Sequence, residues 1–271
     1  MTEATRNDPQ TSLRVGATMR YLARAWRLEL RQLLTSRLYL FVAVFLPLII
    51  ASVAFYMTKG SQRPIPVLSI ALSAALMGMW STTLLGAGNA ITRLRHISVL
   101  EPLVASPMPT ILFTLPFAIA TASLGLYSLV ATLVWSAVFF DLRLETVNWW
   151  LLVSIPVTVL SLGMLGLLMA SAFILYPTAQ SLANLFEYPV WMLSGMLVPV
   201  SALPGALQAV STVLAPTWGV KAVHGAAMGD GDPLVAVGMC LLLSGLYLGV
   251  TLIVLRRFEW LARSSGTLSL R

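Results

Sequence analysis

The sequence has little charge, one cysteine and two histidines. Only 10% of its 271 residues are charged, against about 25% in a soluble globular domain. Water is therefore not the main solvent of this chain. A single cysteine, Cys240, excludes a disulfide framework and a cysteine metal cluster within the chain.

The sequence also has no signature of an enzyme. It contains no G-x-x-x-x-G-K-[ST] phosphate loop, no H-E-x-x-H and no G-x-S-x-G. His96 and His224 fall on opposite sides of the membrane in the topology predicted below, which excludes a paired histidine site. We therefore predict no catalytic residues, no metal site and no cofactor bound by this chain.

Long apolar runs without charge are what the sequence has instead. Residues with an apolar side chain make up 58% of the chain, and five runs carry no charged residue: 67–91, 104–140, 146–186, 188–220 and 233–255. About 20 apolar residues cross a bilayer as a helix. The composition thus predicts an all-α, polytopic membrane protein.

Six transmembrane helices are predicted within residues 38–256. The run 146–186 would be about 60 Å long as one helix, so it must fold back, and Pro177 marks the break at Tyr176–Thr178. Pro199, Pro204 and Pro216 interrupt the apolar stretch after the fifth span, which predicts an outer re-entrant region over 197–232. The predicted spans are about 38–57, 67–91, 110–140, 149–175, from 179 onward, and 234–255.

The segments outside the spans are basic. Residues 1–14 are predicted to be a flexible N-terminus, 15–37 an amphipathic interfacial helix with Arg20, Arg24, Arg27 and Arg31 on one face, and 257–271 a cytoplasmic tail. With the N-terminus inside, 13 of the 17 basic residues are cytoplasmic and four are outside, so both termini are predicted to be cytoplasmic. The basic residues that give the net charge of +7 flank the apolar segments. This distribution argues against a nucleic-acid partner.

Two groups of residues within the spans are candidates for function. Small residues recur every four positions in the second span, which permits close packing either inside the subunit or at a dimer seam: Ala74, Gly78, Thr82, Gly86 and Ala90. Glu187 is the only carboxylate inside a predicted span, and Phe186, Tyr188 and Trp191 lie beside it. An intramembrane carboxylate is costly, so we predict either a substrate path lined by these four residues or a structural pairing of Glu187.

A hairpin at 92–109 is too apolar for a free loop and too short for another span. Its segment Arg95–Pro107 resembles the cytoplasmic coupling segment of ABC-2 type transporter permeases, R-E-x-G-T-L-E-x-L-x-x-[ST]-P, although His96, Ser98 and Val99 depart from that pattern. The stretch from Ser194-Gly195 through Pro199, Leu203-Pro204, Leu207-Gln208 and Pro216-Thr217 resembles a second motif of the same family. The order of elements agrees over 15–260.

The resemblance implies a permease subunit of an ATP-driven exporter. It implies a second permease, identical or homologous, and two ATP-binding subunits that hold ATP and Mg and press on the coupling helix. The residues implied in coupling are Arg93, Arg95, His96, Leu100, Glu101, Leu103, Ser106 and Pro107. Such exporters move hydrophobic or amphipathic substrates such as drugs, lipids or lipid-linked glycans out across the cytoplasmic membrane of a prokaryote. A secondary transporter or channel-like subunit without an ATPase partner is the alternative.

Overall fold

The computed structural model describes residues 9–59, 65–96, 109–142, 148–175, 179–229 and 232–265, and every regular element in them is a helix. The predicted all-α fold of a polytopic membrane protein is confirmed. The helices are α1 (Pro9–Thr35), α2 (Arg37–Lys59), α3 (Val67–His96), α5 (Ile111–Phe139), α6 (Trp150–Leu175), α7 (Ala179–Leu193), the 3-10 helix η1 (Val200–Ala202), α8 (Gly205–Val213), α9 (Ala215–Met228) and α10 (Pro233–Ser265).

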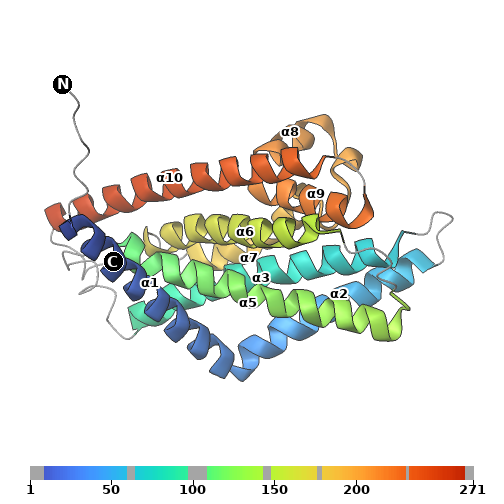
Figure 1. The fold of residues 1–271 in the computed structure, drawn as a ribbon, viewed down its shortest axis with the longest axis horizontal. Coiled ribbons are helices and arrows are strands. Elements are labelled where there is room, and N and C mark those ends of the chain that lie inside the picture. The colour runs from blue at the N-terminus through green and yellow to red at the C-terminus, as the bar shows by residue number, and fades with distance from the viewer. Residues whose placement is uncertain are drawn as a thin grey trace.

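The long helices form one bundle in which they run side by side (Figure 1). Within the described residues, five helices are long and apolar enough to cross a membrane: α2, α3, α5, α6 and α10. The short helices α8 and α9 lie at one end of the bundle, and α1 lies at the other end with the C-terminal part of α10 (Figure 1). Helix α7 lies between α6 and α8 in the chain and is shorter than any of these five helices.

Helix α3 is the centre of the bundle. In its most apolar window 78% of the residues are buried, whereas only 17% are buried in that of α2. Gly78 and Gly86 of α3 leave no room for a Cβ, because it would lie 2.2 Å from Ser128 and from Thr121 of α5, respectively. Small side chains thus let α5 and α2 pack closely on α3.

Helix α7 ends where the backbone turns at Gly195. This glycine has a φ of +84°, which only glycine adopts readily, and the amides of Met196 and Leu197 donate to the carbonyl of Trp191 at 3.2 and 3.1 Å. Helix α7 therefore has 15 residues and a length of about 22 Å, less than the roughly 30 Å of hydrocarbon in a bilayer. The predicted fifth span is shorter than a complete crossing.

Several predicted boundaries differ from the structure. Helix α1 begins at Pro9, so residues 9–14 are helical and not part of a flexible N-terminus. Helix α10 continues to Ser265, so much of the predicted tail 257–271 extends the last span as helix. Residues 92–96 of the predicted hairpin are the last turn of α3, while 97–108 and the break at Tyr176–Thr178 lie outside the described residues. The predicted ends of the spans were placed at charged residues. A helix continues through such residues, however, because its backbone hydrogen bonds do not depend on the polarity of the side chains.

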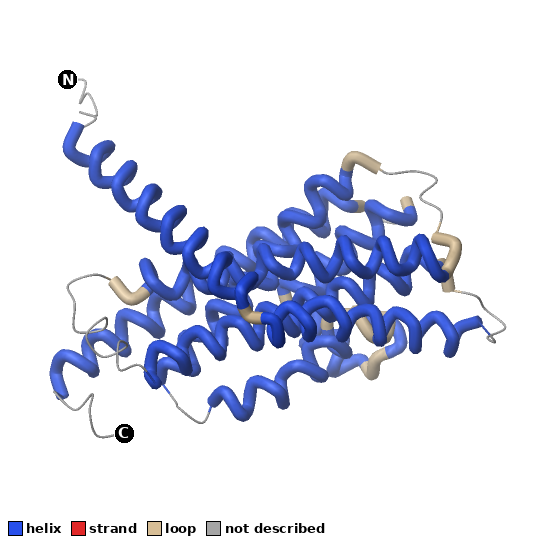
Figure 2. Tube along the Cα trace, turned by 90° about the horizontal axis from the view of Figure 1, so that it is seen from below, coloured by secondary structure: helices blue, strands red, loops and turns tan. Residues whose placement is uncertain are grey.

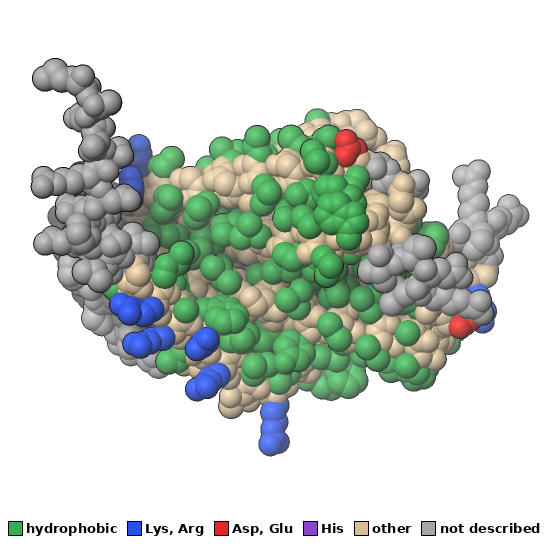
Figure 3. Space-filling view, in the orientation of Figure 1, with side chains coloured by type: hydrophobic (Ala, Val, Ile, Leu, Met, Phe, Trp, Pro, Cys, Tyr) green, Lys and Arg blue, Asp and Glu red, His purple; other side chains and the backbone are tan. Residues whose placement is uncertain are grey.

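Helix α1 leans out of the bundle at an angle to the other helices (Figure 2). Its arginines Arg20, Arg24, Arg27 and Arg31 are exposed, and its other face packs Leu33, with Trp26 and Leu30 beside it, on Ala120 and Leu124 of α5. The space-filling view shows apolar side chains across the middle of the molecule and lysine and arginine side chains gathered at the end that carries α1 (Figure 3).

Candidate functional site

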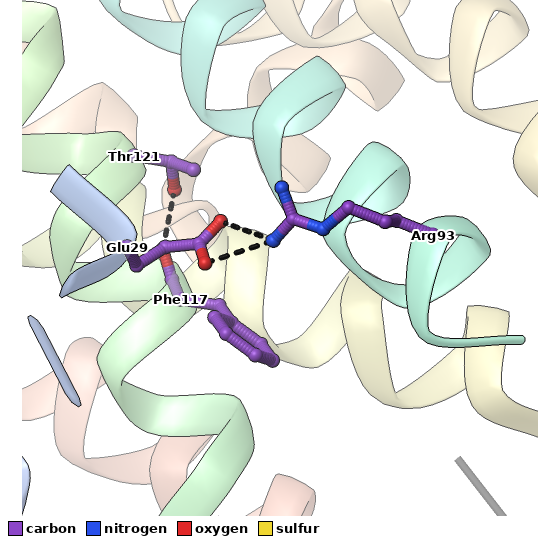
Figure 4. Close-up of polar contacts among 4 residues, drawn as sticks. All are labelled: Glu29, Arg93, Phe117 and Thr121. Carbon is purple, nitrogen blue, oxygen red and sulfur yellow. Dashed lines mark hydrogen bonds and ion pairs between the residues drawn. The ribbon is translucent and has the colours of Figure 1, made fainter. Parts of the chain in front are cut away.

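An ion pair joins α1 to the end of α3 that leads into the predicted coupling segment. Arg93 Nη2 donates to both carboxylate oxygens of Glu29, at 3.0 and 2.9 Å. Figure 4 shows the two side chains pointing toward one another beside Phe117 and Thr121 of α5. The side chain of Glu29 is 3% exposed and that of Arg93 is 42% exposed, so the carboxylate is buried and the guanidinium reaches the surface.

Burial raises the pKa of Glu29 above its ordinary value of 4.5, and the charge and hydrogen bonds of Arg93 act in the opposite direction. A buried carboxylate without such a partner is strongly unfavourable. Glu29 is a site residue that was not predicted from the sequence. Its position gave a signal, because it lies three residues after Trp26 and four before Leu33, on the apolar face of an amphipathic helix.

Of the predicted coupling residues, the structure describes the side chain of Arg93 only. Arg95 and His96 belong to the last turn of α3, with side chains outside the described part. Leu100, Glu101, Leu103, Ser106 and Pro107 lie outside the described residues. The structure therefore fixes one flank of the predicted coupling segment and ties that flank to α1.

Glu187 lies on α7 where this helix meets α3. The hydroxyl of Ser81 on α3 donates to the Glu187 carboxylate. The sequence left two possibilities for Glu187, a path-lining role and a structural pairing. The structure gives the carboxylate a polar partner within the same chain and leaves it half-buried, so one oxygen is tied while the group still reaches the surface.

The aromatic residues beside Glu187 separate onto two faces of α7. Phe186 is 48% exposed and Tyr188 63% exposed, whereas Trp191 is 8% exposed and packs in the main core. Tyr188 meets the edge of Trp191 at 5.2 Å between ring centroids. A helix turns 100° per residue, which directs 187 and 191 toward α3 and 186 and 188 away from it. Trp191 is therefore a core residue in this chain, and its place in the predicted substrate path stays a prediction.

The small-residue series on α3 packs inside the chain. Ala74, Thr82 and Gly86 are buried, and a Cβ at Gly78 would meet Pro47 of α2 at 2.8 Å in addition to Ser128. Tyr39 of α2 donates to the Thr82 carbonyl on the same stripe. Ala90 belongs to α3, with a side chain outside the described part. Of the two alternatives that the sequence left open, the contacts correspond to packing between helices of one subunit.

The described residues bring no three His, Cys, Asp or Glu side chains together as metal ligands. Cys240 is buried, with its sulfur 3.5 Å from the Ala215 carbonyl.

A buried central helix surrounded by apolar spans, a basic end and an amphipathic helix fixed to that end define a polytopic membrane protein. Residues 17–228 match the family model described as ABC-2 type transporter. The chain belongs to this family, and it is a permease, the membrane-embedded transport subunit of an ABC transporter. No curated protein matches the chain.

Proposed function

We propose that this chain is the permease subunit of an ATP-driven exporter in the cytoplasmic membrane of a prokaryote, with both termini in the cytoplasm. It works with a second permease, identical or homologous, and with two ATP-binding subunits that supply ATP and Mg. Its substrate is hydrophobic or amphipathic, of the class that includes drugs, lipids and lipid-linked glycans.

The observation that carries the substrate class is the surface of α7. Leu185, Phe186, Tyr188 and Met192 expose apolar and aromatic side chains along one helix, and the Glu187 carboxylate lies at the edge of that surface. Aromatic faces attract cations as well as apolar groups. A substrate that moves between two permease chains would meet this surface, so Phe186, Glu187 and Tyr188 are the proposed path residues.

The proposed coupling uses the joint between α1 and α3. Residues 97–108 follow directly after α3, and the Glu29–Arg93 pair holds the end of α3 against a helix that lies outside the span bundle. Force applied to the coupling segment by an ATP-binding subunit would reach α1 and α3 together. The pair supports such a transfer because a buried carboxylate and its cation separate only at a high cost.

Affinity purification from native membranes tests the proposal. We expect an ATP-binding protein to copurify with the chain and the complex to hydrolyse ATP faster when substrate is added. Reconstituted vesicles should then transport substrate only with ATP. Transport driven by an ion gradient, from vesicles that contain the chain without an ATPase, would support the secondary-transporter alternative and contradict the proposal.

A further inference from the structure

A cavity of about 810 Å³ lies at the end of the bundle opposite α1, between α2, α3, α9 and the turn at 194–201. This volume is within the roughly 300–1,000 Å³ typical of sites for small molecules. Its walls are mostly apolar, with Ile50 and Met57 from α2, Ile70 and Met77 from α3, and Met196 and Leu197 from the turn. An apolar ligand of substantial size would fit these walls.

One strip of the cavity wall is polar. His224 of α9 lies between two serines one turn apart on α3, with Nδ1 3.3 Å from the Ser69 hydroxyl and Nε2 3.3 Å from the Ser73 hydroxyl. Burial lowers the pKa of His224, so the ring is neutral at pH 7, and one serine donates to it while the other accepts. From Ile70 to Leu84, Ser73 is the one residue of α3 that is not buried, because it faces the cavity.

A cation lies at the rim beside this strip. Lys221 lines the cavity and holds its ammonium 4.4 Å from the centroid of the Trp218 ring. No carboxylate is among the described residues that line the cavity. Asp232 lines an adjoining cavity of about 490 Å³ with Lys221 and His224, but its Oδ1 accepts the Leu234 amide at 3.1 Å at the start of α10. An anion at the rim would meet a cation there.

We propose that this cavity binds an amphiphile with an anionic head, with the head at Lys221 and the apolar chain between α2 and α3. The serine hydroxyls support this assignment, since a bond to His224 uses one of the three hydrogen-bonding positions of each hydroxyl and leaves capacity for the polar end of a ligand. This cavity is separate from the exposed surface of α7. Its assignment rests on the proposed function only in treating amphiphiles as the molecules that this permease handles.

Photolabelling of the purified permease in nanodiscs of zwitterionic lipid tests the site. The probes are palmitic acid with a diazirine in its chain and the matching neutral alcohol, and mass spectrometry locates the labelled peptides. We expect palmitic acid to label peptides that contain 69–77, 194–201 and 218–224. Lys221→Gln should lower this labelling roughly two- to fivefold, as loss of one exposed ion pair does, and leave labelling by the alcohol unchanged.

Lys59→Gln is the matched control, because Lys59 is an exposed cation at the same end that does not line the cavity. Ser73→Leu should fill the cavity and reduce labelling by both probes. Labelling spread evenly over the lipid-facing helices, an equal effect of Lys59→Gln and Lys221→Gln, or labelling lost whenever two permeases associate would each overturn the proposal. The last result would mean that the second permease fills the cavity.

Adding an anionic phospholipid to the nanodiscs distinguishes two sources of the ligand. Competition identifies a bilayer lipid, and undiminished labelling identifies a separate amphiphile, with the anionic head established in both cases. The assay uses neither ATP nor an ATP-binding subunit. Absence of labelling would therefore contradict the proposed site and not the proposal of ATP-driven export. Absence of ATP-driven transport would contradict that proposal and not the site.

Discussion

Two carboxylates lie among apolar helices in the described part of this chain, and each has a partner on α3. Glu29 of α1 is paired with Arg93, and Glu187 of α7 accepts a hydrogen bond from Ser81. The two differ in how they are shielded, because Glu29 is buried and Glu187 is half-buried. Charge in a fully buried position serves as a joint between elements, whereas charge that still reaches a surface can also meet a substrate.

Arg93→Ala should destabilise the permease, because it leaves Glu29 buried without its cation. We expect a loss of about 1–3 kcal/mol at neutral pH, measured as thermal unfolding in detergent. Without Arg93, burial alone acts on Glu29 and raises its folded-state pKa above the ordinary 4.5. The contribution of Glu29 to the stability of this variant is then greatest below pH 4.5 and falls as pH rises through the raised pKa. The loss of stability relative to the unsubstituted chain should therefore be smaller near pH 5 than near pH 8.

Two variants control this experiment. Glu29→Gln combined with Arg93→Ala removes the titrating group, and the pH dependence of the deficit should disappear with it. Arg27→Ala removes an exposed arginine from α1, the helix of Glu29, and should change the free energy of unfolding by less than about 0.5 kcal/mol. A deficit in Arg93→Ala that is the same at both pH values would show that Glu29 is not its source.

Glu187→Gln should change transport without lowering expression or assembly. Glutamine keeps the shape of the side chain and can still accept from Ser81, so the variant removes only the charge. Transport of a cationic amphiphile should fall roughly two- to fivefold, while an uncharged substrate should be little affected. Ser81→Ala, which keeps the charge, is the control. Failure of Glu187→Gln to assemble would instead assign the carboxylate a structural role.

At the scale of elements, the stripe of small residues on α3 determines how closely its neighbours pack. Gly78→Ala should cost about 1–3 kcal/mol in thermal stability, since the new Cβ would collide with Ser128 and Pro47. Gly245→Ala in α10 is the control, because nothing lies within 4 Å of a Cβ at that position. A Gly78→Ala chain of normal stability that no longer dimerises would mean that the stripe is a seam between subunits.

The predicted coupling segment is tested through Glu101. Glu101→Ala or Glu101→Lys should weaken copurification of the ATP-binding subunit or separate ATP hydrolysis from transport. A carboxylate at such an interface accepts hydrogen bonds from basic groups, and loss of a close pair costs about 2–5 kcal/mol. Normal copurification together with normal substrate-stimulated hydrolysis in both variants would refute the assignment.

The sequence predicted the helices more fully than their contacts. The uncharged runs of the sequence predicted most ends of α2, α3, α5, α6 and α10 to within a few residues. They did so because the thickness of the bilayer sets the length of the apolar helices that cross it. Whether Trp191 and Gly78 face the core of their own chain depends on which helices pack beside α7 and α3. The sequence does not specify these neighbouring helices. The Glu29–Arg93 pair joins positions 64 residues apart, so only the fold could reveal it.

For the whole molecule, burial is uneven around the bundle. Helix α3 is enclosed, while α2 and α7 expose large apolar side chains such as Phe41, Phe45 and Tyr188. In a membrane such surfaces face lipid or another chain. The exposed sides of α2 and α7 are consistent with a permease that completes its path only with a second permease, as proposed above.

The orientation of the whole chain is a prediction that labelling can test. Single cysteines at Lys59, Arg143 and Lys221 should react with an impermeant thiol reagent from outside, and cysteines at Glu101 and Arg263 only after the membrane is opened. A Cys240→Ala background avoids signal from the native thiol. The prediction follows from the 13 basic residues assigned to the cytoplasmic side, and Lys59 and Lys221 both lie at the end of the bundle away from α1. Labelling of position 101 from outside would show that the orientation in the membrane is the reverse of the predicted one. The coupling segment would then face away from any cytoplasmic ATPase.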